Sequence, residues 1–142
     1  MTVEAIHLGA ARVPELWTVD TVLAVAGKGL EGDRHFHENG ARPGQALTLV
    51  AAEEVEAVGL APGETRRQVT VRGVDVNGLV GKRFRVGEVE CVGVELCEPC
   101  THLQEMTGRP GLIKELAHRA GINADIVGGG TIRVGDPVVE LS

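Results

Sequence analysis

The strongest constraint on the fold is the way glycine divides the chain into short apolar runs. Glycine supplies 20 of the 142 residues, about double the share of roughly 7% that is usual in proteins. The runs between glycines are rich in β-branched residues, which favour strands. Aromatic residues make up only 2% of the chain, so the core must be aliphatic. Short strands and tight turns predict a mainly β fold: a closed or nearly closed β-barrel of mostly antiparallel strands with two or three short helices.

The local pattern predicts where strands and helices lie within a single domain that spans residues 1–142. Strands are expected at 3–8, 19–26, 46–50, 67–71, 89–96 and 123–127, and helices at 52–58, 103–106 and 112–119. Gly59 follows the first helix as a C-terminal cap. The segments 83–91 and 131–138 share one apolar-Arg-Val-Gly-acidic pattern, which predicts two hairpins that turn at Gly87 and Gly135.

Composition and charge argue against several classes of protein. The net charge of −6 and the lack of aromatic stacking platforms disfavour nucleic-acid binding. No run of about 18 apolar residues is present, so no membrane-spanning segment is expected. Residues 1–7 lack the basic and apolar regions of a signal peptide. Three cysteines, an odd number without a secretory context, predict free thiols in a reducing cytoplasm.

Reactive side chains are densest at 94–103, which contains Cys97, Cys100 and His102. Cys100 is expected between a strand and a short helix, where backbone N–H groups and the helix dipole favour the thiolate. A buried structural thiol is the alternative. His102 can pair with that thiolate, so Cys100 and His102 are the candidate catalytic residues. Cys91 is expected to point into the core.

Cys97 leaves three interpretations open. It could form a redox pair with Cys100, although the expected fold lacks the βαβ context of such pairs. It could bind zinc together with Cys100, His102 and His118, although no second Cys-x-x-Cys pair is present. It could also be a neighbouring or resolving thiol. His118 is otherwise expected to cap the C-terminus of its helix.

A glycine-rich polar loop at 27–37 and an arginine-rich strand supply donors for an anionic ligand. In a regular strand Arg67 and Gln68 point to opposite faces, so at most one of them lines a pocket, and Arg67 and Arg72 share no face. A solvated loop and ordinary exposed arginines are the alternative. The candidate ligand-binding residues are Asp33, Arg34, His35, Arg67 and Arg72.

Five stretches, in order, resemble the motifs of the MOSC domain, the module at the C-terminus of molybdenum cofactor sulfurases. They are GLEGDRH at 29–35, RRQVTVRG at 66–73, LVGKRFRVG at 79–87, LCEPCTHL at 96–103, and GINADIV with IRVGDPV at 121–138. Cys100 falls on the signature cysteine of that family. Gln68 stands where the family usually has asparagine, and Asn123 or Asp125 where it often has a basic residue.

The resemblance implies a β-barrel of MOSC type and sulfur carriage through a persulfide on Cys100. It also implies molybdenum cofactor (molybdopterin) as the ligand, with a molybdoenzyme or its cofactor as the sulfur acceptor. Pyridoxal phosphate binding occurs in the wider family, but this chain has no pyridoxal-binding domain, so a cysteine desulfurase would supply the sulfur. Any enzymatic activity would be that of a sulfurtransferase or a reductase. The alternatives are a non-catalytic molybdopterin- or anion-binding module and a thiol- or molybdenum-dependent reductase of N-hydroxylated compounds.

Overall fold

The computed structural model describes residues 1–10, 15–98, 108 and 111–141. Within them, strands dominate and the helices are short. The strands are β1 (Thr2–Gly9), β2 (Leu16–Val19), β3 (Thr21–Val25), β4 (Gly29–Leu30), β5 (Leu47–Ala51), β6 (Val69–Arg72), β7 (Arg83–Val86), β8 (Val89–Leu96), β9 (Ile122–Gly128), β10 (Gly130–Arg133) and β11 (Val138–Glu140). The helices are α1 (Ala52–Ala57), the 3-10 helix η1 (Asn77–Leu79) and α3 (Leu112–Glu115).

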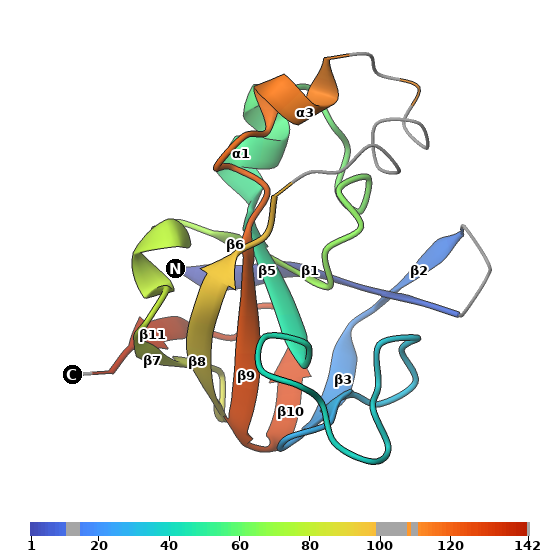
Figure 1. Cartoon of the computed structure of the whole chain (residues 1–142), viewed down its shortest axis with the longest axis vertical. Helices are drawn as coiled ribbons and strands as arrows, with labels where there is room; N and C mark the ends of the chain where they lie inside the picture. Colours follow the sequence, from blue (N-terminus) through green and yellow to red (C-terminus); the bar gives the residue numbers. More distant parts are fainter. Residues whose placement is uncertain (11–14, 99–107, 109–110, 142) are drawn as a thin grey trace.

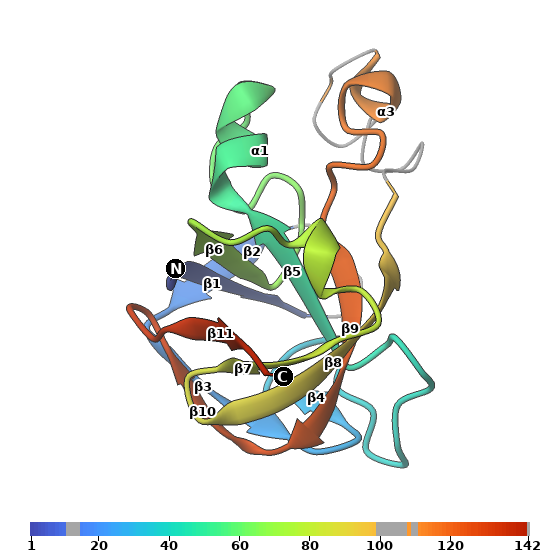
Figure 2. The ribbon, with the colours of Figure 1, turned by 90° about the vertical axis from the view of Figure 1, so that its left-hand side faces the viewer.

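The strands form an eight-stranded sheet in the order β11-β7-β8-β9-β5-β6-β1-β2 and a three-stranded sheet in the order β10-β3-β4. Every pairing is antiparallel except β5 with β6. The large sheet curls around the core, and α1 and α3 stand together at one end of it (Figures 1 and 2). The mainly β, mostly antiparallel prediction is confirmed.

The prediction of a closed or nearly closed barrel is not supported, because neither sheet closes on itself. The large sheet ends at β11 on one side and at β2 on the other. Where β1 meets the segment before β11, the pairing is an isolated bridge between Thr2 and Pro137. The backbone bonds that frame this bridge run from Val3 N–H to the carbonyl oxygen of Asp136 at 2.8 Å and from Val138 N–H to that of Met1 at 3.0 Å.

The core lies between the two sheets and is aliphatic except for Phe84, whose ring is fully buried in it. Alternation in β6 buries Val69 and Val71 fully, as predicted. Thr70, on the other face of β6, is buried as well. Its partner on β5, Val50, belongs to a second apolar cluster with residues of α1 and α3, so this face of the sheet is covered too. Cys91 is fully buried and burial raises its pKa to about 12, so this thiol is a core residue, as expected.

Local turn signals predicted some connections correctly and others not. The hairpin of β7 and β8 turns at Gly87, which has a φ of 60°, and α1 ends before Gly59, with a φ of 73°. The hairpin predicted at 131–138 is wrong, because β10 pairs with β3 whereas β11 pairs with β7. The helix predicted at 112–119 ends at Glu115, and 103–106 lies outside the described residues.

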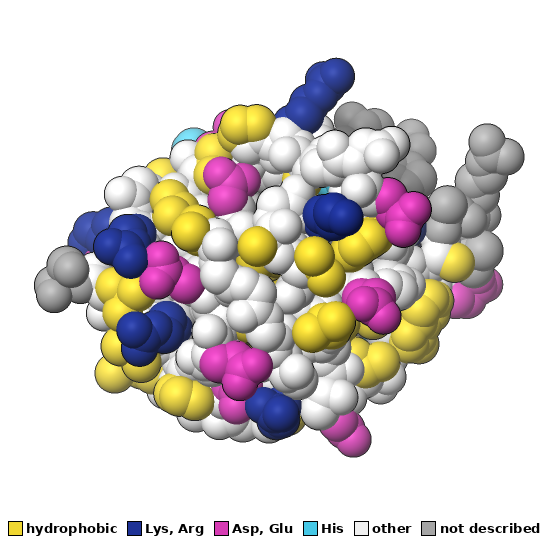
Figure 3. Space-filling model, turned by 90° about the horizontal axis from the view of Figure 1, so that it is seen from below, with side chains coloured by type: hydrophobic (Ala, Val, Ile, Leu, Met, Phe, Trp, Pro, Cys, Tyr) yellow, Lys and Arg dark blue, Asp and Glu magenta, His cyan; other side chains and the backbone are white. Residues whose placement is uncertain are grey.

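Charges of both signs are mixed on the face that Figure 3 shows: lysine and arginine side chains are interspersed with aspartate and glutamate. Among the described residues, no helix has the length and apolar character needed to cross a membrane.

His7 makes the fold sensitive to pH. Its side chain on β1 is 7% exposed, and its Nδ1 has no hydrogen-bond partner in the described structure. A Cβ at Gly63 would lie 2.7 Å from its Cδ2 and Nε2, so the turn at 61–65 packs directly on the ring. Burial lowers the pKa of His7 below its ordinary value of 6.5.

The unfolded chain therefore binds a proton that folded His7 resists. This contribution to stability is present in full above a pH of about 6.5 and is lost as the pH falls below that value towards the folded pKa. We expect the free energy of unfolding in urea to fall less between pH about 7.5 and pH about 5.5 in His7→Gln than in the wild type. His118→Gln, which removes an exposed imidazole that contacts Glu98, should not reduce this fall. Equal pH dependence in His7→Gln and the wild type would contradict the assignment.

Candidate functional site

A pocket of about 420 Å³ brings together residues from the loop before β5, the approach to β6, and the facing ends of β8 and β9. We call it the site pocket. Backbone N–H of Gly44 donates to Asp125 Oδ1 at 2.7 Å, which ties the loop to β9. The lining residues are His35, His37, Pro43, Gly44, Gln45, Thr48, Arg67, Gln68, Glu95, Cys97 and Asn123.

Asp33 is only 6% exposed, and both oxygens of its carboxylate accept hydrogen bonds from other groups of the protein. Oδ1 accepts from the backbone N–H of Gly9 at 2.8 Å. Oδ2 accepts from Gln68 Nε2 at 2.7 Å and from the backbone N–H of His35 at 3.1 Å. Asp33 therefore positions the loop and does not line the site pocket.

Gln68 links this carboxylate to β5. Its Oε1 accepts from the backbone N–H of Thr48 at 2.9 Å, and its own backbone N–H donates to Thr48 Oγ1 at 2.8 Å. Arg67 and Gln68 both line the pocket, contrary to the expected alternation. The reason is that β6 begins only at Val69, and Arg66 has a φ of 63°, so the chain before it is not a regular strand.

His35 lines the site pocket next to Arg34 in sequence. Burial lowers the pKa of His35 from 6.5, and the charge of Arg34 lowers it further. Asp33 raises this pKa, and His37 and Arg66 have smaller lowering effects. At neutral pH the imidazole is therefore uncharged and can donate one hydrogen bond and accept another. Arg34 lies 3.8 Å from Asp33 Oδ1, with its side chain 15% exposed.

Cys97 also lines the site pocket and is 8% exposed. Its thiol donates to Asn123 Oδ1 at 2.7 Å, and Asn123 Nδ2 donates to Glu95 Oε1 at 3.3 Å. Burial raises the pKa of Cys97, and Glu95 adds to this, while Arg67 opposes it. Cys97 is thus held as a neutral thiol, and a thiolate would face the oxygen of Asn123.

Arg67 bridges two other chain segments. Its Nε donates to the carbonyl oxygen of Ala120 at 2.7 Å, and its Nη2 lies 3.5 Å from the carbonyl oxygen of Glu98. Glu98 in turn accepts from the backbone N–H of His118 at 2.9 Å and contacts His118 Nδ1 at 3.3 Å.

The structure does not bring the predicted arginines together. Arg67 lines the site pocket, whereas Arg34 lies beside Asp33. Arg72 is elsewhere, with its side chain 41% exposed, and forms ion pairs with Glu4 at 2.6 Å and with Glu56. Arg72 is not among the residues that line the site pocket, and its role in ligand binding stays a prediction.

The cysteine motif is described only up to Glu98, so Cys100 and His102 lie outside the described residues. Of the hypothetical zinc ligands, Cys97 is bonded to Asn123 and His118 to Glu98. His118 has a φ of 62° and lies beyond the end of α3 rather than capping it. No group of three or more metal-ligating side chains occurs in the described part of the chain.

Sequence reasoning missed the polar partners Glu95 and Thr48 of the site pocket. In the sequence Glu95 is a polar residue near the end of the predicted strand 89–96, and Thr48 lies within the predicted strand 46–50. Neither position carries a local signal of a binding site. Asn123 was noted as a departure from the family pattern, which is the one signal that pointed to it.

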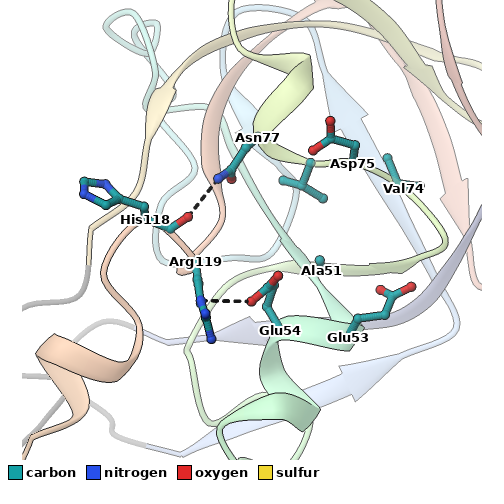
Figure 4. Close-up of a pocket in the computed structure, with 9 residues that line it drawn as sticks. Ala51, Glu53, Glu54, Val74, Asp75, Asn77, His118 and Arg119 are labelled. Carbon is teal, nitrogen blue, oxygen red and sulfur yellow. Dashed lines mark hydrogen bonds and ion pairs between the residues drawn. The ribbon is translucent and has the colours of Figure 1, made fainter.

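A second hollow of about 160 Å³ lies between α1, η1 and the turn after α3 (Figure 4). Its polar groups are paired within the protein: Arg119 Nε lies 3.5 Å from Glu54 Oε2, and Asn77 Nδ2 donates to the carbonyl oxygen of His118 at 2.8 Å. Glu53 accepts from the backbone N–H of Gly73 at 2.7 Å. These bonds connect α1, the segment 73–77 and the turn after α3 to one another, and we therefore assign the hollow a structural role.

Solved structures with the same fold were found at low sequence identity. YuaD from Bacillus subtilis is 20% identical with a TM-score of 0.78, over 97% of this chain and 94% of that one. YiiM from Geobacillus stearothermophilus is 18% identical with a TM-score of 0.75, over 99% and 75%. YiiM from Escherichia coli is 17% identical with a TM-score of 0.72, over 100% and 70%.

The family comparison agrees with the sequence motifs. A search of the curated proteins gave no match. The model of the MOSC domain matches residues 32–139, which include the Asp33 loop, Arg67, Gln68 and the whole cysteine motif. The chain therefore belongs to the MOSC domain family.

Proposed function

We propose that this protein is a sulfur carrier that holds sulfur as a persulfide on Cys100 and delivers it to a ligand in the site pocket. One observation carries the proposal: Cys97, three residues before Cys100, lines a pocket of about 420 Å³ together with several polar side chains. The chain thus runs from the pocket wall directly into the signature cysteine motif.

The three cysteines are chemically distinct under this proposal. Cys91 is a core thiol with a pKa of about 12, and Cys97 is a buried thiol whose pKa is raised. Neither is a good nucleophile at neutral pH, because the thiolate is the reactive form. Cys100, with His102 as its partner, is left as the thiol that the sequence motif assigns to sulfur transfer.

Loading is a balanced exchange. The Cys100 thiolate attacks the outer sulfur of a persulfide on a donor such as a cysteine desulfurase. A new S–S bond forms on Cys100, the donor S–S bond breaks, and the donor thiolate leaves. No external oxidant or reductant is consumed.

The site pocket suits molybdenum cofactor or a related anionic ligand. Its volume falls within the roughly 300–1,000 Å³ that is typical of small-molecule sites. The charges of Arg34 and Arg66 act on His35, which favours an anionic group such as phosphate beside it. Glu95 and Asn123, which also line the pocket, can accept hydrogen bonds from N–H groups. Such a cofactor, when bound, would supply the metal centre that takes up sulfur. Release of the outer sulfur from Cys100 as sulfide would need two electrons from a thiol reductant and would return Cys100 as the thiol.

The test is mass spectrometry of the intact protein and its peptides after mild treatment with a polysulfide. We expect one added sulfur on Cys100, none in Cys100→Ser, and a loaded Cys100 in Cys97→Ser. Because Cys100→Ser replaces one small side chain with another, the free energy of unfolding should barely change.

Three outcomes would contradict sulfur carriage. An unmodified Cys100 together with tight binding of a pterin would indicate a non-catalytic binding module. A Cys97–Cys100 disulfide that exchanges with added thiols would indicate a thiol reductase. A large loss of stability in Cys100→Ser would mean that this residue is part of the core.

A further inference from the structure

We propose that Arg67 is a positioning residue that braces the chain leading into the cysteine motif, rather than a ligand for an anion. Its Nε is hydrogen-bonded to the carbonyl oxygen of Ala120 at 2.7 Å, and its Nη2 reaches the carbonyl oxygen of Glu98 at 3.5 Å. Two of its nitrogens are therefore directed at backbone carbonyls. These carbonyls belong to segments that lie 31 and 53 residues away in sequence.

The two segments that Arg67 joins are already neighbours. The ladder of β8 and β9 ends at the pair Leu96 and Ile122. Beyond it, the backbone N–H of Cys97 donates to the carbonyl oxygen of Gly121 at 2.8 Å. The carboxylate of Glu98 then holds the backbone and imidazole of His118. These contacts hold 97–98 and 118–121 against each other.

Arg67 adds a third segment to this junction. It comes from the approach to β6, next to Gln68, which is anchored to Asp33 and Thr48. The guanidinium of Arg67 therefore fixes the start of the cysteine motif relative to Gln68, which lines the site pocket. Its charge also acts on Cys97, whose pKa it lowers against the effect of burial.

The shape of the guanidinium matters for this role. Its N–H groups form a rigid planar fork that can reach two acceptors at once, whereas lysine presents a compact ammonium at the end of a flexible chain. A brace to two carbonyls therefore requires arginine. A site that needs only positive charge for an anion would accept lysine.

The functional consequence rests on the proposed sulfur transfer, but the brace itself can be tested without it. The variants are Arg67→Lys, which keeps the charge and loses the fork, and Arg67→Met, which loses both. Arg85→Met, at an exposed position on β7, is the matched control. All are made in the intact chain and also in a Cys100→Ser background, where Cys97 is the remaining cysteine that lines the site pocket and its slow alkylation can be followed alone.

In the Cys100→Ser background, amide hydrogen exchange at Cys97 should be at least about tenfold faster in both Arg67 variants, because the opening of a local unit is set by its own contacts. Exchange at Leu49, in the middle of the sheet, should be unchanged. The pH profile of Cys97 alkylation should move to higher pH in Arg67→Met and stay near that of Cys100→Ser alone in Arg67→Lys. If Arg67 acted only through packing, Arg67→Met and Arg67→Lys would give the same pH profile of Cys97 alkylation.

With Cys100 intact, polysulfide loading should be slower in both variants by up to about a hundredfold, as expected for a misplaced reacting group. Affinity for inorganic phosphate, the probe for anion binding, should be similar in Arg67→Lys, Arg67→Met and the wild type. The brace is overturned if Arg67→Lys exchanges and loads like the wild type while Arg67→Met loses phosphate binding. If the wild type itself loads no sulfur, the proposed function fails, while hydrogen exchange and alkylation still decide the brace.

Discussion

Gly121→Ala is expected to lower the free energy of unfolding by roughly 3–5 kcal/mol, the sum of backbone strain and overpacking. Gly121 has a φ of 96°, a conformation that L-residues rarely adopt. A Cβ at this position collides with the carbonyl oxygen of Leu49 and lies 3.0 Å from its carbonyl carbon. Both obstacles are backbone atoms of β5, so no side-chain movement relieves them.

Gly135→Ala is the matched control, because Gly135 has a φ of 94° and no atom within 4 Å of the added Cβ. It should cost only the backbone term, about 1–2 kcal/mol. Urea denaturation of both variants gives the difference, which isolates the collision. Equal losses of stability in the two variants would show that the backbone of β5 moves aside. That result would contradict a rigid contact between Gly121 and Leu49. Gly121→Ala should also weaken the bond from Cys97 to Gly121.

Asp33→Ala is expected to lower the free energy of unfolding by roughly 3 kcal/mol or more, because it leaves buried donors without an acceptor. The donors are the backbone N–H groups of Gly9 and His35 and the side-chain amide of Gln68. Losing them also frees His35 from its place in the site pocket. Urea denaturation measures the loss of stability, and hydrogen exchange at Gly9 and His35 locates it.

Two further variants sharpen this result. Asp33→Asn keeps the shape and one acceptor oxygen, so it should lose less stability than Asp33→Ala. Asp20→Ala, at an exposed position, should be nearly neutral. If Asp33→Ala were as mild as Asp20→Ala, the carboxylate would not hold the loop, and its predicted role as a ligand-binding residue would be favoured instead.

Features that depend on neighbouring residues were predictable from the sequence. The bounds of β8 coincide with the prediction of 89–96, because strict alternation and a glycine turn define that strand locally. Gly59 and Gly87 do adopt positive φ angles where caps and turns require them. Gly135 also does so, yet its flanking strands belong to different sheets. The choice of partner strand depends on distant residues, and a turn signal carries no information about it.

The site could also be predicted only where neighbouring residues determine it. The sequence brought attention to the right segments, since His35, Arg67 and Cys97 all line one pocket. It could not show that the carboxylate of Asp33 faces inward, because a polar residue in a loop has the same local pattern whether it binds a ligand or a backbone. Nor could it show the bond between Cys97 and Asn123, which are 26 residues apart.

The site pocket is built from contacts between remote parts of the chain. The bond from Gly44 to Asp125 spans 81 residues, and that from Arg67 to Ala120 spans 53. Contacts of this range slow folding, because closing the long intervening loop costs conformational entropy before the contact is gained. The binding site and the folded state therefore arise in one cooperative event. A fragment that stops before β9 would lack Asn123 from the pocket lining and Asp125, which anchors the loop at Gly44, however well its own strands formed.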